Sequence, residues 1–257
     1  MRIFLTGASS GIGAALAHHY AATGAILGLA ARHQRRLSDL VAELPTVLPG
    51  KHAIYPLDVT DAPALQAAAT DFIARFGCPD IVIANAGISV GTLTSELEDL
   101  PVFRRVFETN VFGMVHTFAP FIQAMQARGS GTLVGIASVA GIRGLPGAGA
   151  YSASKAAVIA YLEALRVELR GSGIQVVTLL PGYIATPMTA KNPYPMPFLL
   201  PADVAARRFA RAIACGTSYV VIPWQMGLVA KLLRWLPNPL FDAIFSRAGR
   251  KPRGLDL

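Results

Sequence analysis

Cysteine and charge are both scarce in this sequence. Only two cysteines are present, Cys78 and Cys215, and charged residues make up 15% of the chain. Two thiols argue against a disulfide scaffold and cannot supply a four-cysteine zinc site. A chain that is 53% hydrophobic with so little charge is not disordered, and it can bury a large core.

Long apolar runs are missing as well. No segment reaches about 18 uninterrupted apolar residues, so we expect no membrane-spanning helix. The amino terminus leads from Met1 directly into a glycine-rich turn, which leaves no room for a signal peptide. We therefore expect a cytoplasmic protein. With 257 residues and no low-complexity linker, the chain fits a single α/β domain.

The usual patterns of metal and nucleophilic catalysis are also absent. The sequence contains neither H-E-x-x-H nor G-x-S-x-G. Two adjacent histidines would point in different directions from a helix, so we predict no metal site. The five histidines are His18, His19, His33, His52 and His116.

Acidic residues are outnumbered by basic ones. The chain has 15 Asp and Glu against 23 Lys and Arg, which gives a net charge of +8. This excess leaves a nucleic acid, an anionic membrane and a phosphate group open as partners. Most basic residues are scattered and no nucleic-acid recognition motif appears, so we expect no nucleic-acid partner.

Short β-branched runs alternate with alanine-rich amphipathic stretches. Several runs are apolar almost without alternation, which is typical of strands covered by helices on both faces. The expected strands are residues 2–6, 25–31, 52–57, 80–84, 132–137, 174–180 and 218–222. The expected helices are residues 12–23, 35–44, 62–75, 101–128, 151–171 and 202–215. This alternation predicts an α/β fold with a doubly wound, seven-stranded parallel sheet.

A glycine-rich turn, TGASSGIG at residues 6–13, follows the first expected strand and opens the first helix. Its glycines permit a tight turn, let the backbone approach a pyrophosphate and let the helix pack closely on the strand. The start of the helix would then offer N–H groups to the phosphates. The alternative is a plain glycine turn. The residues predicted to bind are Gly7, Ser9, Ser10, Gly11, Ile12 and Gly13.

Three motifs together resemble the short-chain dehydrogenase/reductase family: TGASSGIG, NAG at residues 85–87 and YSASK at residues 151–155. The resemblance covers about residues 2–222, and the motifs stand in the order and spacing of the family. It implies a Rossmann fold over a single domain, a nicotinamide dinucleotide cofactor, and hydride transfer to or from a small-molecule carbonyl compound or alcohol.

The end of the second expected strand predicts which cofactor binds. Ala31 stands where NAD-preferring members of the family carry Asp, and Arg32 follows where NADP-preferring members often carry Arg. A carboxylate would repel a 2′-phosphate, whereas Arg offers it a charge-assisted partner. Arg35 and Arg36 add positive charge nearby, although Ser10 stands where many NADP-preferring relatives have a basic residue. We predict NADP rather than NAD, with a solvated arginine cluster as the alternative.

Further cofactor contacts follow from the resemblance alone. Two residues after the third strand would meet the adenine, the NAG motif would back the ribose of the nicotinamide, and the turn after the sixth strand would border the nicotinamide. These residues are Asp58, Val59, Asn85, Ala86, Gly87, Pro181, Gly182, Ile184 and Thr186. The alternative is that they form ordinary turns at strand ends, which Asn, Gly and Pro suit.

Tyr151 and Lys155 stand four residues apart on an expected helix, so they share one face. The ordinary pKa of tyrosine is about 10, and a neighbouring ammonium favours the phenolate and lowers that pKa. Tyr151 would then serve as general acid or base. The resemblance adds Ser138 as the residue that polarises the substrate carbonyl, and Asn110 as the holder of a water linked to the lysine. It also makes Lys155 a ligand of the nicotinamide ribose.

The chain continues beyond the last strand with an apolar and basic extension, residues 223–257. Six basic and two acidic residues give its last 34 residues a net charge of +4 (6 − 2). They are Lys231, Arg234, Arg247, Arg250, Lys251 and Arg253, against Asp242 and Asp256. Three interpretations compete: packing over the active-site mouth of its own domain, a contact in a homo-oligomer (a dimer rather than a tetramer), and a peripheral membrane contact through residues 224–257.

Proline-rich residues 187–201 are interpreted as a loop that covers the substrate. Their apolar side chains suit a hydrophobic or acyl-type carbonyl compound. The sequence therefore predicts an oxidoreductase that transfers hydride between NADPH and a carbonyl compound or secondary alcohol. The alternative is an NADP(H)-binding sensor or scaffold that retains the fold without turnover.

Overall fold

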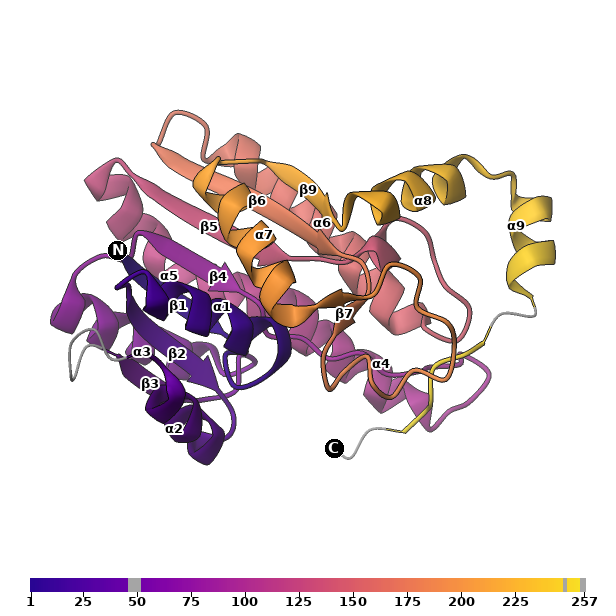
Figure 1. The fold of residues 1–257 in the computed structure, drawn as a ribbon, viewed down its shortest axis with the longest axis horizontal. Coiled ribbons are helices and arrows are strands. Elements are labelled where there is room, and N and C mark those ends of the chain that lie inside the picture. The colour runs from indigo at the N-terminus through magenta and orange to yellow at the C-terminus, as the bar shows by residue number, and fades with distance from the viewer. Residues whose placement is uncertain (46–51, 247–248, 255–257) are drawn as a thin grey trace.

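The computed structural model describes residues 1–45, 52–246 and 249–254 (Figure 1). Seven parallel strands form one sheet in the order β3-β2-β1-β4-β5-β6-β9. They are β1 (Arg2–Thr6), β2 (Ile26–Ala31), β3 (Ala53–Pro56), β4 (Ile81–Ala84), β5 (Gly131–Ile136), β6 (Ile174–Pro181) and β9 (Tyr219–Ile222). The predicted doubly wound sheet is confirmed, with strand bounds close to those expected.

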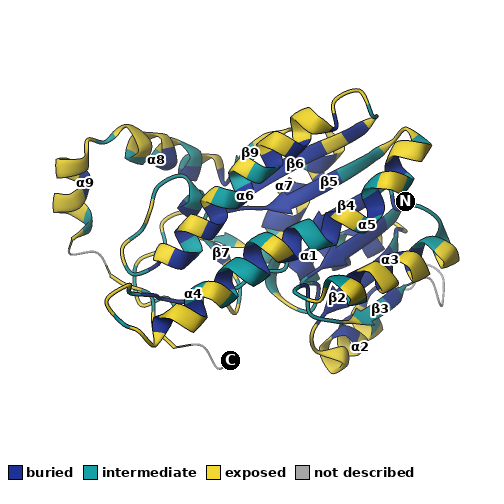
Figure 2. Cartoon of the chain, turned by 180° about the vertical axis from the view of Figure 1, so that it is seen from behind, coloured by how far each residue is buried: buried dark blue, intermediate teal, exposed yellow. Residues whose placement is uncertain are grey.

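Helices cover both faces of this sheet. One face carries α1 (Gly11–Ala22), α2 (Gln34–Glu43) and α7 (Ala202–Ala214). The other carries α3 (Ala62–Phe76), α5 (Gly113–Arg128) and α6 (Gly149–Glu168). Ile3 and Leu5 of β1 belong to the first core and Phe4 to the second, because successive side chains of a strand point to opposite faces. Figure 2 shows the strands as a buried layer between the helices.

The helix predicted over residues 101–128 is interrupted. The structure has α4 (Asp99–Phe107), one turn of π-helix, η1 (Glu108–Phe112), and then α5. The predicted helical stretch is therefore confirmed, and the π-turn within it was not predicted. π-turns of this kind are frequent at functional sites. This one holds Asn110, whose exposed fraction is 0%.

A small second sheet was not predicted. β7 (Ile184–Ala185) pairs in parallel with β8 (Leu200–Pro201), so the two ends of the proline-rich segment lie side by side. A short 3-10 turn, η2 (Val139–Gly141), follows β5 and leads toward α6. Both features lie at the carboxyl end of the main sheet, where Ser138, just before η2, and Ile184 of β7 line the pocket described below.

The extension after β9 forms α8 (Trp224–Trp235) and α9 (Asn238–Phe245), which project from the body of the molecule (Figure 1). Met226 and Ala230 of α8 are buried. A Cβ atom on Gly182 would lie 2.6 Å from Cγ of Met226, so this helix packs directly behind the turn that follows β6. One face of α8 therefore packs on its own domain.

Arg143, in the loop after η2, holds the extension against the body of the molecule. Its guanidinium donates to the carbonyl oxygens of Leu233 and Leu236, each at 2.8 Å, and lies 4.1 Å above the ring centre of Phe241. These bonds satisfy carbonyl groups that the end of a helix leaves without partners. Residues 249–254 then run back toward α4 in both views of the molecule (Figures 1 and 2). Arg247 and Asp256 of the predicted extension lie outside the described residues.

Two predicted absences concern the described residues only. Among them, no helix is both long and apolar enough to cross a membrane. The same residues contain no group of three or more His, Cys, Asp or Glu side chains that could hold a metal ion.

Candidate active site

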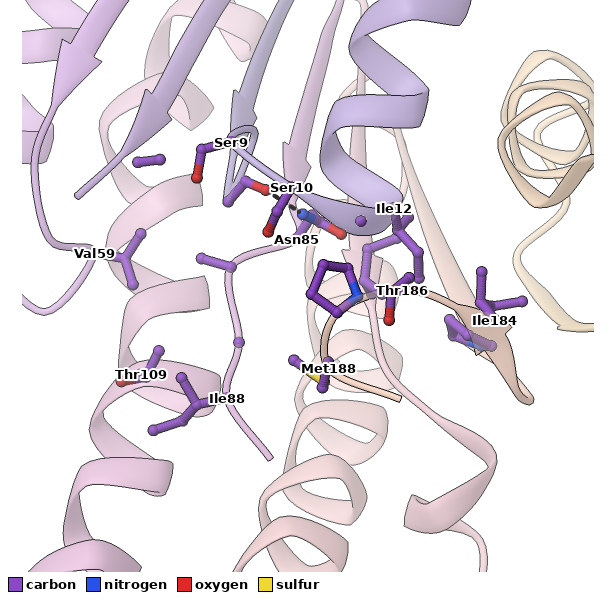
Figure 3. A pocket seen from close by; sticks show the side chains of 18 of the residues that line it. Ser9, Ser10, Ile12, Val59, Asn85, Ile88, Thr109, Ile184, Thr186 and Met188 are labelled. Atoms are coloured by element: carbon purple, nitrogen blue, oxygen red, sulfur yellow. Dashed lines mark hydrogen bonds between the residues drawn. The ribbon is translucent and has the colours of Figure 1, made fainter. Parts of the chain in front are cut away.

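A pocket opens at the carboxyl ends of β1 and β4 (Figure 3). The chain order of the strands reverses between these two, and ligands of doubly wound sheets bind at such a reversal. Figure 3 shows Ser9 and Ser10 on one side of the pocket, Val59 and Thr109 on another, and Thr186 on a third. Segments far apart in the sequence therefore enclose one cleft.

The structure brings nearly all of the predicted cofactor residues into this pocket. Ser138 also lines it, whereas Gly13 and Asn110 lie behind its wall. The predicted residues in the lining are Gly7, Ser9, Ser10, Gly11, Ile12, Arg32, Asp58, Val59, Asn85, Ala86, Gly87, Tyr151, Lys155, Pro181, Gly182, Ile184 and Thr186.

The glycine-rich turn has the geometry that its sequence predicts. Gly7 has a φ of +64° and Gly11 a φ of +56°, which side-chain-bearing residues rarely adopt. A Cβ atom on Gly13 would lie 2.1 Å from the carbonyl oxygen of Gly7 and 2.7 Å from Nδ2 of Asn85. Only glycine at position 13 therefore lets α1 approach β1 so closely.

The start of α1 is open to a ligand. Ser10 occupies the N-cap position, but its side chain makes no capping hydrogen bond. The first N–H groups of a helix have no partner within the helix, and they carry the positive end of its dipole. Because Gly11 and Ile12 line the pocket, this helix end faces it. The arrangement is suited to an anion such as a diphosphate.

Positive charge gathers at the end of the pocket next to β2. Arg32 and Arg36 both line it and are exposed, whereas Arg35 is not in the lining. Ala31, at 8% exposure, offers no carboxylate there. His33, which sequence reasoning did not single out, also lines this end. Its position shortly after a strand was the only feature of the sequence that could have indicated a place in the pocket.

Asp58 is held by neighbours that the sequence did not reveal. Its Oδ2 accepts a hydrogen bond from Arg105 at 2.6 Å, and its Oδ1 accepts from the backbone N–H of Thr60 at 3.0 Å. Burial alone would raise the pKa of Asp58, but the bonds from Thr60 and the charge of Arg105 outweigh it and hold that pKa below its usual value. The carboxylate is therefore ionised and fixed at the pocket wall.

Asn110 positions the segment that follows β4. Its Oδ1 accepts from the N–H of Ile88 at 2.8 Å, and its Nδ2 donates to the carbonyl of Ile88 and to Oγ of Ser154, both at 3.0 Å. A Cβ on Gly87 would lie 3.1 Å from Oδ1 of Asn110 and 3.7 Å from Nζ of Lys155. Asn110 therefore lies close to Lys155, and its hydrogen bonds connect Ile88, directly after the NAG motif, to α6.

Tyr151 enters the pocket from the first turns of α6. Burial raises its pKa above the usual 10, and a hydrogen bond with Ser138 acts in the opposite direction. Oγ of Ser138 also accepts from the N–H of Ala140 at 3.1 Å, which fixes the serine at the start of η2. Tyr151 is therefore protonated near neutral pH, and Ser138 is the polar side chain placed beside it.

Lys155 is buried one helical turn further on. Its Nζ donates to the carbonyl of Ile136 at 2.7 Å and lies 5.9 Å from the ring centre of Tyr151. Burial lowers the pKa of Lys155 to about 8. The lowering of the tyrosine pKa that we expected from this lysine does not outweigh burial in this arrangement.

The proline-rich segment contributes to the pocket at its beginning. Pro187, Met188 and Thr189 join the lining, and Oγ1 of Thr189 donates to the carbonyl of Thr186 at 3.0 Å. Farther along, Phe198 and Leu199 are 49% and 45% exposed. These contacts agree with a loop that borders the pocket.

Known proteins resemble this chain along most of its length. A family model described as short chain dehydrogenase matches residues 1–195. An uncharacterized oxidoreductase of Myxococcus xanthus is 39% identical over 247 residues, covering 95% of both chains. Dehydrogenase/reductase SDR family member 7B of Danio rerio is 38% identical over 193 residues, covering 73% of this chain and 62% of its own.

Solved structures agree with this relationship. A short chain dehydrogenase/reductase from Burkholderia phymatum in complex with NAD superposes with a TM-score of 0.81 at 25% identity, over 99% of this chain and 98% of that one. An alcohol dehydrogenase from Thermococcus sibiricus complexed with 5-hydroxy-NADP gives 0.76 at 27% identity, over 86% and 95%. Sequence, fold and relatives agree: the chain belongs to the short-chain dehydrogenase family, a family of oxidoreductases.

Proposed function

We propose that this protein is an NADP-dependent oxidoreductase that interconverts a carbonyl compound and its alcohol, with Tyr151 as general acid and base. The observation that carries the proposal is the joint placement of Tyr151, Ser138 and Lys155 in one pocket whose far end holds Arg32 and Arg36. A sensor or scaffold without turnover would not need a partly buried tyrosine beside a fixed serine and a buried lysine.

The lining fits a nicotinamide dinucleotide. The uncapped start of α1 suits its diphosphate, and Gly87 leaves room beside Lys155 for a ribose. When bound, this cofactor supplies hydride to the carbonyl carbon or accepts it in the reverse direction. Relatives of known structure bind NAD in one case and an NADP derivative in another. Arg32, Arg36 and the absence of a carboxylate at Ala31 support NADP for this chain.

The protein side chains then handle the proton. Oγ of Ser138 and the hydroxyl of Tyr151 would hold the substrate oxygen and stabilise the charge that develops on it. Tyr151 donates its proton to that oxygen in reduction and removes it in oxidation. Lys155, as an ammonium, favours the phenolate of Tyr151, and the positive nicotinamide acts in the same direction. Asn110 acts as a positioning residue near Lys155.

The proline-rich segment, residues 187–201, favours a substrate with a substantial apolar part. Met188 lines the pocket, and Phe198 and Leu199, farther along the proline-rich segment, are exposed apolar residues. The test is NADPH oxidation with a panel of aldehydes and ketones of increasing chain length. An increase in kcat/KM with chain length supports this substrate class, and a preference for the smallest carbonyl compounds contradicts it.

We also propose a peripheral membrane contact through the outer face of α8 and α9. These two helices carry six exposed large apolar side chains, and Lys231 and Arg234 of α8 are also exposed. The apolar side chains are Trp224 (65%), Leu228 (53%), Leu232 (68%), Trp235 (82%), Leu240 (56%) and Ile244 (60%). Tryptophan and leucine beside cations are suited to an anionic lipid surface.

Flotation with vesicles of phosphatidylcholine and phosphatidylglycerol tests this contact. The double variant Leu232→Ser, Trp235→Ser should lose vesicle binding, whereas Leu97→Ser removes an equally exposed leucine elsewhere and should retain it. A different result would assign the face to a homodimer contact instead. In that case the parent protein does not bind the vesicles and is a dimer, whereas the double variant is a monomer.

A further inference from the structure

The carboxyl-terminal strap, residues 249–254, lies against the loop that follows β4. The N–H of Gly91 donates to the carbonyl of Pro252 at 2.9 Å, and Gly91 forms a parallel bridge with Arg253. A Cβ on Gly91 would lie 2.3 Å from the carbonyl oxygen of Lys251. The absence of a side chain at Gly91 therefore permits this close approach.

Arg253 anchors the strap to α4. Its Nε donates to Oδ2 of Asp99 at 2.9 Å, and its Nη2 lies 3.5 Å from Oε2 of Glu96. Asp99 is only 5% exposed, and the same oxygen accepts from the N–H of Leu93 at 2.7 Å. Two nearby carboxylates are thus already engaged by Arg253.

The strap brings a second lysine to the catalytic tyrosine. Nζ of Lys251 lies 5.2 Å from the ring centre of Tyr151, compared with 5.9 Å for Nζ of Lys155. It donates to Oγ of Ser89, a residue two positions beyond the NAG motif. Within the described parts of the chain, Lys251 takes part in none of the ion pairs. Burial lowers the pKa of Lys251 to about 8, so the ammonium form still predominates at neutral pH.

A partly buried ammonium without a carboxylate partner is costly, and a bound anion offsets part of this cost. Ser89 accepts from Lys251, which leaves the hydroxyl proton of Ser89 free for a second acceptor. Two donors, one of them charged, thus lie together beside Tyr151. This pair matches the two oxygens of a carboxylate.

We propose that Lys251 is a substrate-binding residue that holds the carboxylate of an oxo acid, or of the hydroxy acid in the reverse direction. The proposal rests on the proposed function, because it places this carboxylate next to the carbonyl group that Tyr151 serves. The proline-rich segment then holds the remainder of the substrate, and the strap determines which carbonyl compounds are accepted.

Paired substrates provide the test: acetoacetate, levulinate and benzoylformate, each against its methyl ester, with NADPH oxidation as the readout. The parent should prefer the acid in at least one pair. In Lys251→Gln the KM for that acid should rise by about 10- to 100-fold, with kcat and the KM of the ester little changed. Lys251→Arg should restore part of the loss, and Arg170→Gln, an exposed cation just after α6, should behave as the parent.

Arg253→Ala should reproduce the KM effect of Lys251→Gln, since it releases the strap without touching the pocket. A cooperative thermal unfolding transition and an NADPH affinity equal to that of the parent show that each variant folds. Turnover of neutral ketones with Tyr151 dependence, but of no acid, overturns the role of Lys251 and leaves the proposed function intact. Equal KM increases for acid and ester in Lys251→Gln also overturn it. If no compound is turned over, calorimetry of benzoylformate with the NADP⁺-loaded protein decides: binding that Lys251→Gln abolishes supports the proposal, and equal binding refutes it.

Discussion

Replacement of Gly13 by alanine tests the close packing on which the cofactor site depends. The new Cβ would lie 2.1 Å from the carbonyl oxygen of Gly7 and 2.7 Å from Nδ2 of Asn85. Carbon–oxygen contacts of about 3.3 Å are the closest that ordinarily occur, so the helix must move by about 1 Å. The oxygen belongs to the backbone, and no side-chain rotation relieves the contact.

The cost should lie near the upper end of the range for overpacking, about 3 kcal/mol. For a protein of this size, that corresponds to a decrease in Tm of about 6–12 °C. The same movement carries the first N–H groups of α1 away from a bound diphosphate. Loss of one charge-assisted hydrogen bond there should weaken NADPH binding by about tenfold or more.

Thermal unfolding and calorimetric titration with NADPH measure both effects. Gly149→Ala is the matched control, since a Cβ there meets nothing within 4 Å at the start of α6. We expect that control to gain up to about 1 kcal/mol from the better helix propensity of alanine. A Gly13→Ala protein with the Tm of the control and unchanged NADPH affinity would refute the steric argument.

Three further predictions concern other parts of the site. Arg32→Asp should weaken NADPH binding much more than NADH binding, whereas Arg35→Asp, outside the pocket lining, should affect both little; calorimetry that shows equal weakening in Arg32→Asp contradicts the phosphate assignment. Burial lowers the pKa of Lys155 to about 8 against 10.5 in the unfolded chain. The folded protein therefore loses this proton first, and Lys155→Met should be the more stable protein below pH 8, by at most about 3 kcal/mol. This advantage should close as the pH rises from 8 to 10.5, and a constant difference in urea unfolding would contradict the reasoning. Asn110→Leu leaves the partly buried N–H and C=O of Ile88 without partners and should cost about 1–3 kcal/mol in the same experiment, whereas no measurable loss would show that these bonds are dispensable.

Local sequence features predicted the fold and much of the pocket. Gly7 and Gly13 could be assigned because a strand, a tight turn and a helix follow one another within a few residues. Arg32 could be placed at the same edge of the sheet because it directly follows a strand, but its expected contact with a phosphate came from the resemblance to the family. Periodicity and turn chemistry were sufficient for the strands, the helices and the glycine-rich turn. The roles expected of Asp58, Ser138 and Asn110 came instead from the resemblance to the family.

Features that depend on distant parts of the chain could not be predicted in this way. The bond from Arg105 to Asp58 joins two elements that periodicity places only approximately. The π-turn at Asn110 changes the hydrogen-bond register without changing the apolar pattern. β7 and β8 are too short to recognise, and the contact of Lys251 with Tyr151 spans a hundred residues (251 − 151). Each needs the tertiary structure, because the sequence spacing carries no information about it.

The central claim is that Tyr151 exchanges a proton with a substrate held in the NADPH pocket. Steady-state NADPH oxidation by the parent and by Tyr151→Phe, with any accepted carbonyl compound, tests it most directly. We predict a loss of kcat/KM of about 10²–10⁴-fold in the variant, at unchanged NADPH affinity, because the phenylalanine ring has no proton to donate. A variant that retains the parent's kcat/KM would contradict the account.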